Sequence, residues 1–248
     1  MELKGKNILV TGASSGIGQA IAIACARKGA KVLLNYRRNL KGATQTRRSV
    51  ERHSTGVLFR ADLTDGEQVE SMFAKISSEV GRVDVLVNNA GGAQPGDFFD
   101  NERWREQFEN IFFSALHVSQ FFLRQHRASS LRKILNITSY YGNPGGGNTE
   151  HFAYSVAKAA LSSMTTTLAK VDGKVLVNAI APGYTWTPLW EGISKAEKNR
   201  YASKTMIGRY VTADEIAHAA VGILENDAIT GQIITVDGGL SLQQAERK

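Results

Sequence analysis

Short, continuously apolar runs alternate with segments of helical periodicity along most of the chain. The apolar runs predict strands, and they are "NILVT" (7–11), "KVLLNY" (31–36), "GVLFRA", "VDVLVNN" (83–89), "KILNITS" (133–139), "KVLVNAIA" (174–181) and "QIITVDG". The segments between them predict helices. The first covers about 16–28, a polar helix after 31–36 ends near 52, and another begins near 64. Two longer helices cover roughly 102–127 and roughly 150–171. Strands that are apolar throughout and alternate with helices predict a parallel sheet with helices on both faces.

The composition is that of a globular α/β protein. The 248 residues are 42% hydrophobic and 21% charged, and no repeat, low-complexity segment or linker divides them, so we expect a single domain over 1–248. The segment "MELKGKNILVTG" lacks the apolar length of a signal sequence, and no apolar stretch is long enough to span a membrane. Cys25 is the only cysteine, which excludes an intramolecular disulfide and favours a reducing, cytoplasmic location.

The charge balance bears on possible partners. The net charge of +7 suggests nucleic-acid binding as one hypothesis. However, the lysines and arginines are spread along the chain, which favours a solvated basic surface or attraction for a phosphorylated cofactor. The histidines are also scattered and lack the spacing of metal ligands, so we expect no catalytic metal.

A glycine-rich turn joins the first predicted strand to the first predicted helix. Gly12, Gly16 and Gly18 form G-x-x-x-G-x-G, which differs from the usual G-x-G-x-x-G but has the same strand–turn–helix context. Glycine lets the main chain approach a pyrophosphate, and the helix N-terminus offers free N–H groups. The alternatives are a tight loop without a ligand and the G-x-S-x-G nucleophile elbow of hydrolases, which a place on the first strand disfavours.

The end of the second predicted strand is basic. Enzymes that bind NAD usually place a carboxylate there, on the ribose 2′-hydroxyl. This chain instead has "NYRRN", with Tyr36, Arg37 and Arg38. A guanidinium suits a 2′-phosphate through a bidentate, charge-assisted contact, so the sequence predicts NADP(H), with NAD(H) as the weaker alternative. An exposed basic turn without a ligand would also explain these residues.

Several motifs together resemble the short-chain dehydrogenase/reductase family, and in particular its 3-oxoacyl-ACP reductase-like and glucose dehydrogenase-like members. They are "TGASSGIG" (11–18), Asp62, "NNAG" (88–91), Asn110, Ser139, Tyr154-x-x-x-Lys158 and "PGYTWT" (182–187), in family order across nearly the whole chain. The resemblance implies a Rossmann-type, doubly wound sheet of about seven parallel strands in the order 3-2-1-4-5-6-7. It also implies hydride transfer between NADP(H) and a small carbonyl or alcohol substrate. A catalytically silent, NADP(H)-binding regulatory protein of the same fold is the alternative.

Tyr154 and Lys158 are the centre of the expected chemistry. Residues four apart on a helix share one face, with their Cβ atoms roughly 5–6 Å apart. A nearby ammonium favours the phenolate and so lowers the tyrosine pKa from about 10. A tyrosine tuned in this way can act as a general acid or base on a carbonyl or alcohol oxygen. An isolated pair with this spacing would more simply be a packed tyrosine and a solvated lysine.

The resemblance gives further residues a role. It implies that Ser139 bonds the substrate oxygen, that Asn110 anchors a proton-relay water beside Lys158, and that Asp62 contacts the adenine. A turn serine, a locally bonded helix asparagine and a capping aspartate are the respective alternatives. The expected cofactor contacts are Gly12, Ser14, Ser15, Gly16, Ile17, Gly18, Tyr36, Arg37, Arg38, Asp62, Leu63, Asn89, Ala90, Gly91, Tyr154, Lys158, Pro182, Gly183, Thr185 and Thr187.

The last expectations concern the carboxamide, the lid and assembly. Thr187 resembles the threonine that bonds the nicotinamide carboxamide, and Thr185 is the competing candidate. Residues 184–210 offer an apolar and aromatic surface and resemble a lid over the substrate. The predicted helices over 102–127 and 150–171 resemble those that pair subunits in the family, so we expect a homotetramer.

Overall fold

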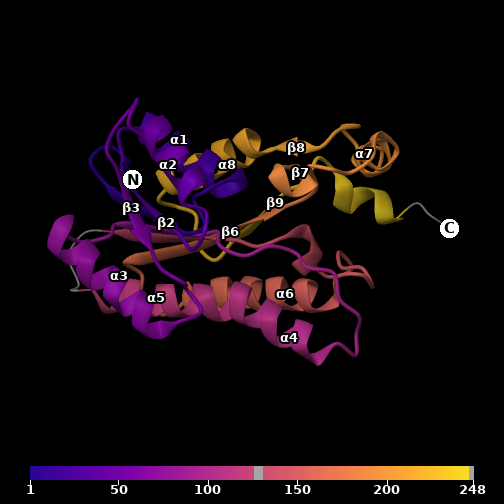
Figure 1. The fold of residues 1–248 in the computed structure, drawn as a ribbon, viewed down its shortest axis with the longest axis horizontal. Coiled ribbons are helices and arrows are strands. Elements are labelled where there is room, and N and C mark those ends of the chain that lie inside the picture. Colours follow the sequence, from indigo (N-terminus) through magenta and orange to yellow (C-terminus); the bar gives the residue numbers. More distant parts are fainter. Residues whose placement is uncertain (126–130, 246–248) are drawn as a thin grey trace.

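The computed structural model describes residues 1–125 and 131–245. Its main sheet has seven parallel strands in the order β3-β2-β1-β4-β5-β6-β9 (Figure 1), which confirms the predicted Rossmann-type arrangement. The strands are β1 (Asn7–Val10), β2 (Lys31–Tyr36), β3 (Gly56–Arg60), β4 (Val85–Asn88), β5 (Arg132–Ile137), β6 (Val175–Pro182) and β9 (Ile233–Val236). The central strands are buried on both faces, as their continuous apolar runs predicted.

Helices cover both faces of this sheet (Figure 1). One layer consists of α1 (Gly16–Arg27), α2 (Leu40–Val50) and α8 (Ala213–Glu225), and α1 and α8 pack closely on one another. The other consists of α3 (Gly66–Glu79), α5 (Ser114–Arg124) and α6 (Phe152–Leu168). Each layer encloses an apolar core: Val10 and Val87 face the first helix layer, and Leu9 and Leu86 face the second. Alternate side chains of one strand therefore pack into the cores on opposite faces of the sheet.

The helix predicted over 102–127 is interrupted. The structure has α4 (Asn101–Gln107), then a π-helix (Phe108–Phe113), then α5, and the predicted end at 126–127 lies outside the described residues. A π-helix forms hydrogen bonds between residues five apart instead of four, and one short segment of it leaves the apolar periodicity of the surrounding helix recognisable. Periodicity alone therefore does not reveal it.

Four elements were not predicted: β7 (Thr185–Trp186), α7 (Lys195–Ala202), β8 (Val211–Thr212) and α8. α7 has no buried residue and therefore no apolar stripe. α8 could have been found, because Thr212 and Glu215 form a capping box before an apolar, helical pattern.

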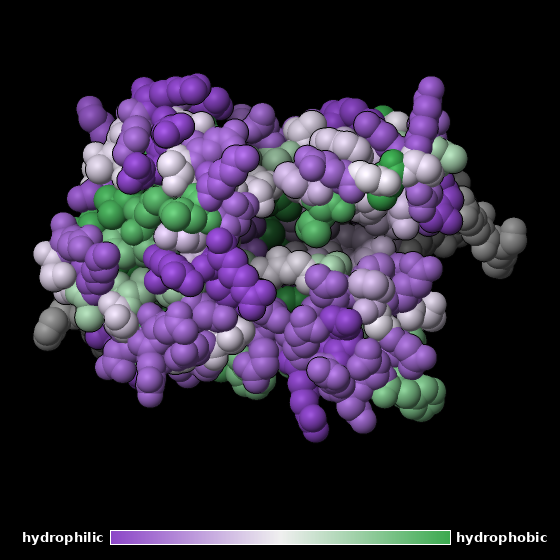
Figure 2. All heavy atoms as spheres, viewed as in Figure 1, coloured by the Kyte–Doolittle hydropathy of each residue, from purple (hydrophilic) through white to green (hydrophobic). Residues whose placement is uncertain are grey.

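The topology brings the ends of four strands to one edge. The order reverses between β1 and β4, whose neighbours β2 and β5 lie on opposite sides. In open α/β sheets ligands bind beyond the carboxyl ends of the strands at such a reversal. On the face drawn in Figure 2 the surface is mostly hydrophilic, and it is hollowed near the middle, where apolar residues are visible at depth. Across residues 1–125 and 131–245, no helix combines the length and the apolar character that a membrane span needs.

Candidate active site

A cavity of about 460 Å³ lies at this edge of the sheet. Its walls come from the loops after β1, β4, β5 and β6, from the start of α6 and from the segment around 184–201. Residues that are far apart in the sequence therefore meet because their strands end together.

The glycine turn after β1 forms one wall. Gly12 and Gly16 have φ of +60° and +58°, a region that side chains other than glycine rarely adopt. A Cβ atom on Gly12 would lie 2.9 Å from the Cα of Ala90, and one on Gly18 would lie 2.4 Å from Asn89 Nδ2. Helix α1 begins at Gly16, and its N-cap Ser15 makes no side-chain capping bond, so the N-terminus can offer N–H groups to an anion. These features fit a dinucleotide pyrophosphate.

Ser139, Tyr154 and Lys158 lie together at the cavity. Ser139 lies two residues after the end of β5, and its side chain hydrogen bonds with the hydroxyl of Tyr154. The buried Lys158 donates from Nζ to the carbonyl of Ile137 at 2.7 Å, and its Nζ lies 5.8 Å from the centre of the Tyr154 ring. The helical spacing thus places phenol and ammonium on the same face of α6, beside the end of β5.

Burial controls the proton affinities of this group. Desolvation raises the pKa of Tyr154 above its usual 10, and the hydrogen bond with Ser139 lowers it in part. Desolvation also lowers the pKa of Lys158 to about 8. The lowered tyrosine pKa expected from the spacing alone is not found, because burial disfavours the phenolate more strongly than its neighbours favour it. Tyr154 therefore holds its proton at neutral pH.

Helix α6 owes its position to apolar packing. Ala157 and Leu161 are buried against Ile111 and Ala115, and the ring of Tyr154 packs on the same cluster. The π-helix and α6 are in extensive contact, so the segment that carries Tyr154 rests on the segment that carries Asn110. This packing fixes the direction in which Tyr154 enters the cavity.

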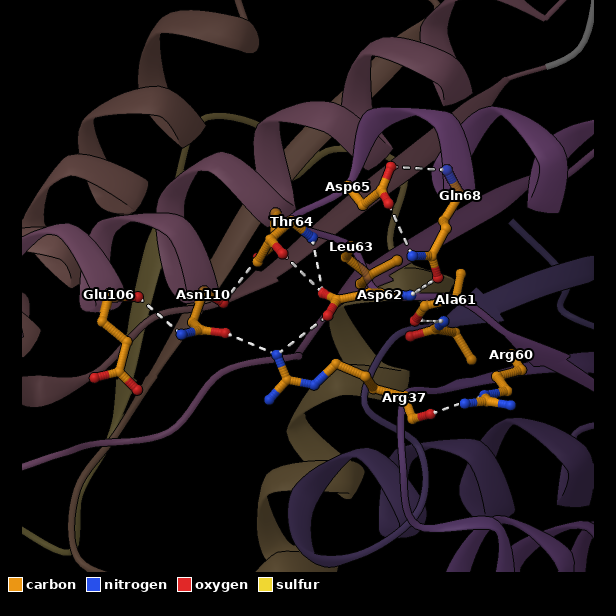
Figure 3. A network of polar contacts seen from close by, with 12 residues as sticks. Arg37, Arg60, Ala61, Asp62, Leu63, Thr64, Asp65, Gln68, Glu106 and Asn110 are labelled. Atoms are coloured by element: carbon orange, nitrogen blue, oxygen red, sulfur yellow. Dashed lines mark hydrogen bonds and ion pairs between the residues drawn. The ribbon is translucent and has the colours of Figure 1, made fainter.

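Asn110 is not among the residues that line the cavity, although its backbone oxygen would lie 3.1 Å from a Cβ atom on Gly91, which does line it. Its Oδ1 accepts a hydrogen bond from Arg37 Nη1 at 3.2 Å, and its Nδ2 donates to the carbonyl of Glu106 at 2.8 Å. Figure 3 shows this network at the ends of β2 and β3, where Arg37 also lies 3.6 Å from the carboxylate of Asp62. Asp62 accepts bonds from the backbone N–H and the hydroxyl of Thr64, as a turn aspartate does.

The remaining predicted residues divide between cavity wall and surroundings. The predicted residues that line the cavity are Gly12, Ser15, Gly16, Ile17, Asn89, Ala90, Gly91, Ser139, Tyr154, Lys158, Pro182, Gly183, Thr185 and Thr187. The predicted residues that lie outside its lining are Ser14, Gly18, Tyr36, Arg37, Arg38, Asp62, Leu63 and Asn110. Ser14, which would be the nucleophile of a G-x-S-x-G elbow, is among the residues outside the lining, and this disfavours the hydrolase alternative.

The two threonines after β6 differ in their surroundings. Thr185 is buried, and its hydroxyl donates to the carbonyl of Gly183 at 3.1 Å. Thr187 lies against the glycine turn, since a Cβ atom on Gly16 would be 3.3 Å from its Cγ2. The hydroxyl of Thr185 is thus already used within its own turn. This favours Thr187 as the residue for the nicotinamide carboxamide.

Aromatic side chains form the rest of the cavity wall. Tyr141 was not predicted, although it follows the strand-terminal Ser139 by two residues. Its ring lies 6.1 Å from that of Tyr154 and 6.4 Å from that of Tyr184, both edge to face, and the two phenols of Tyr141 and Tyr184 hydrogen bond with each other. Trp190 and Tyr201 continue the cluster, with ring centres 5.0 Å apart. Burial raises the pKa of Tyr184, so these phenols are neutral donors and acceptors.

Comparisons with known proteins give consistent results. The family model described as enoyl-(acyl carrier protein) reductase matches residues 12–241. The 3-oxoacyl-[acyl-carrier-protein] reductase FabG of Thermotoga maritima is 30% identical, over 97% of this chain and 99% of its own length. A mutant short-chain dehydrogenase/reductase of Serratia marcescens superposes with a TM-score of 0.89 at 26% identity, covering 97% of this chain and 100% of the other. L-sorbose reductase from Gluconobacter frateurii, solved with NADPH and L-sorbose, has a TM-score of 0.89 at 27% identity and coverages of 97% and 98%.

Proposed function

This chain belongs to the short-chain dehydrogenase/reductase family of oxidoreductases, and on that basis we propose that it transfers a hydride between NADP(H) and a carbonyl or alcohol group of a small molecule. The observation that carries the proposal is the meeting of Ser139, Tyr154 and Lys158 at one cavity that the glycine turn also lines.

The proposed roles follow from the proton affinities. When NADPH is bound, its nicotinamide supplies the hydride that reaches the carbonyl carbon. Tyr154, whose burial keeps it protonated, donates its proton to the carbonyl oxygen, and in the reverse direction its phenolate accepts one. Ser139 donates a hydrogen bond to the same oxygen as charge develops there. The Lys158 ammonium favours the phenolate that remains after the transfer.

The preference for NADP(H) is a separate part of the proposal. No carboxylate follows β2 directly; Arg37 and Arg38 stand there, and both are exposed. An exposed guanidinium can pair with a 2′-phosphate at little desolvation cost. The NADPH in the solved complex of L-sorbose reductase, a structural relative, is in line with this assignment.

A substrate panel tests the proposed reaction. Aldehydes, ketones and the matching alcohols would be offered with each cofactor, and turnover would be followed at the NADPH absorbance. We expect reduction of at least one compact, partly apolar carbonyl compound, because the substrate side of the cavity is lined by Tyr141, Tyr184, Trp190 and Tyr201. NADPH should give the higher kcat/KM. Tight NADPH binding without turnover of any compound would point to the regulatory alternative.

We further propose that residues 1–248 act as one cofactor-binding domain, in which 184–210 close over the substrate. α7 has no buried residue, and the two short strands β7 and β8 on either side of it pair with one another, as in a separate covering segment. The reducing, cytoplasmic location also belongs to this proposal. Its support is that Cys25 is the only cysteine, which excludes an intramolecular disulfide. Burial raises the pKa of this thiol to about 12 and so keeps it unreactive.

A homotetramer built on the α4, α5 and α6 faces completes the proposal. Phe113 and Val156 are 37% and 43% exposed on the π-helix and α6, which neighbour one another. Apolar side chains on adjacent helices favour association with a second copy. Light scattering at micromolar concentration should give four times the chain mass, and a monomer would contradict this arrangement.

A further inference from the structure

The side chain of Asn110 makes two contacts that agree on one orientation. Its Nδ2 donates to the carbonyl of Glu106, and its Oδ1 accepts from Arg37 (Figure 3). An amide nitrogen only donates, and a guanidinium has no acceptor, so exchanging the two amide atoms would break both bonds. The oxygen of Asn110 is therefore turned toward Arg37 by its own helix.

The π-helix accounts for this direction. Ile111, the next residue, is fully buried and packs with Ala157 and Leu161 of α6, next to Tyr154. A Cβ atom on Gly91 would lie 3.1 Å from Ile111 Cγ1, so an isoleucine fills the space between the cavity loop and α6. Adjacent side chains on a helix point in different directions, and π-helical turns are frequent at functional sites. Here the apolar side chain faces inward and the amide faces the end of β2.

Arg37 is also held from a second side. Its Nη1 lies 3.6 Å from Asp62 Oδ2, while Oδ1 of Asp62 is fixed by the backbone and side chain of Thr64. Both contacts of Arg37 use Nη1, and the side chain is 45% exposed, so the rest of its fork can meet a phosphate. Asn110 contributes a neutral acceptor, which restrains the guanidinium without cancelling its charge.

We propose that Asn110 is a positioning residue for Arg37, which it holds in the orientation that receives a 2′-phosphate, and that it thereby sets the preference for NADP(H) over NAD(H). This inference rests on the proposed function, because it assumes that Arg37 binds that phosphate. A free arginine loses rotamer freedom when it binds an anion, and an arginine that is already restrained loses less. The role differs from the proton-relay role that family resemblance implies for this residue.

A double-mutant cycle on cofactor binding tests the role without relying on turnover. Calorimetric affinities for NADP⁺ and NAD⁺ would be measured for the wild type, Asn110→Ala, Arg37→Ala and the double variant. We expect Asn110→Ala to weaken NADP⁺ binding by about fivefold to tenfold and NAD⁺ binding by less than about twofold. In the Arg37→Ala background, Asn110→Ala should add no further loss. Glu109→Ala, at an exposed neighbour in the same π-helix, is the matched control and should leave both affinities unchanged.

The outcomes separate this inference from the proposed cofactor. If Arg37→Ala weakens NADP⁺ selectively but Asn110→Ala does not, only the role of Asn110 is wrong. Equal losses for both cofactors on Asn110→Ala, or the same loss with and without Arg37, would also overturn it, because they indicate a general structural role. If the wild type binds NAD⁺ as tightly as NADP⁺, the proposed cofactor is wrong, and the role of Asn110 falls with it.

Discussion

At the scale of single residues, burial rather than spacing determines the proton chemistry around Tyr154. The four-residue spacing predicted that Tyr154 and Lys158 share a helix face, and they do. Spacing does not report how deeply that face is buried, and desolvation acts on both groups. The contact between Arg37 and Asn110 was beyond prediction for a similar reason, since the two residues are 73 positions apart and meet only in the folded chain.

The buried Lys158 should make stability depend on pH in a defined direction. Its native pKa of about 8 lies below the ordinary 10.5, so the native protein releases this proton first as pH rises. Below about pH 8 the folded protein bears the full cost of burying the charged lysine. Between about pH 8 and 10.5 the folded state loses this proton while the unfolded state keeps it, so the free energy of unfolding rises. Lys158→Met should unfold at a higher urea concentration than the wild type at pH 7, and this difference should narrow from pH 8 to 10. A difference independent of pH would contradict the shifted pKa.

At the scale of elements, buried strands were predictable and exposed or irregular segments were not. The ranges of β1, β2, β4, β5 and β6 agree with the apolar runs to within a few residues, because burial on both faces leaves a continuous signal. The π-helix and α7 leave no such signal: the first keeps helical composition, and the second buries nothing. The glycine turn was located from sequence because its φ values and its close approach to Ala90 require glycine.

Two capping boxes offer a matched test of how helices contribute to stability. Thr212 caps α8 and Ser194 caps α7 with the same pair of hydrogen bonds. α8 buries Ile216, Ala217 and Ala220 against the core, whereas α7 buries no residue. Thr212→Ala should therefore lower the free energy of unfolding by about 1 kcal/mol, and Ser194→Ala should leave it nearly unchanged. Urea titrations of both variants check this, and an equal loss would mean that α7 is an integral part of the folding unit.

At the scale of the whole molecule, the same edge of one sheet gathers residues from across the chain. The order of the strands followed from the family motifs, and with it the meeting of Gly12, Ser139 and Pro182 at one cavity. What did not follow was the shape of the aromatic wall, because Tyr141, Tyr184 and Trp190 come from loops whose paths depend on tertiary contacts. Substrate selection is thus the least predictable property of the site.

An ion pair at the opposite edge of the sheet links distant parts of the chain. Lys133 on β5 is 2% exposed, and its Nζ lies 2.6 Å from Asp227 Oδ1 and donates to the carbonyl of Asn226. Asp227 Oδ1 also pairs with the N-terminal ammonium of Met1, and the Asp227 side chain is 52% exposed, so solvent screens both pairs. We therefore expect Asp227→Asn to lower the free energy of unfolding by about 1 kcal/mol at pH 7. The pairing lowers the pKa of Asp227, chiefly through its bond with Lys133, so this contribution is lost only as pH falls below the ordinary aspartate range. If Asp227→Asn has the same free energy of unfolding as the wild type at pH 7, the ion pair contributes nothing to stability.

The most direct test of the whole account is the turnover of Tyr154→Phe with NADPH, measured beside its affinity for NADPH. The substitution removes one hydroxyl and keeps the ring that packs on Ile111 and Ala157. We expect kcat to fall by at least about a thousandfold, because the proton donor is lost, while the affinity for NADPH stays within about threefold of the wild type. Turnover that survives the substitution at more than about a tenth of the wild-type rate would contradict the assignment of Tyr154 as the acid.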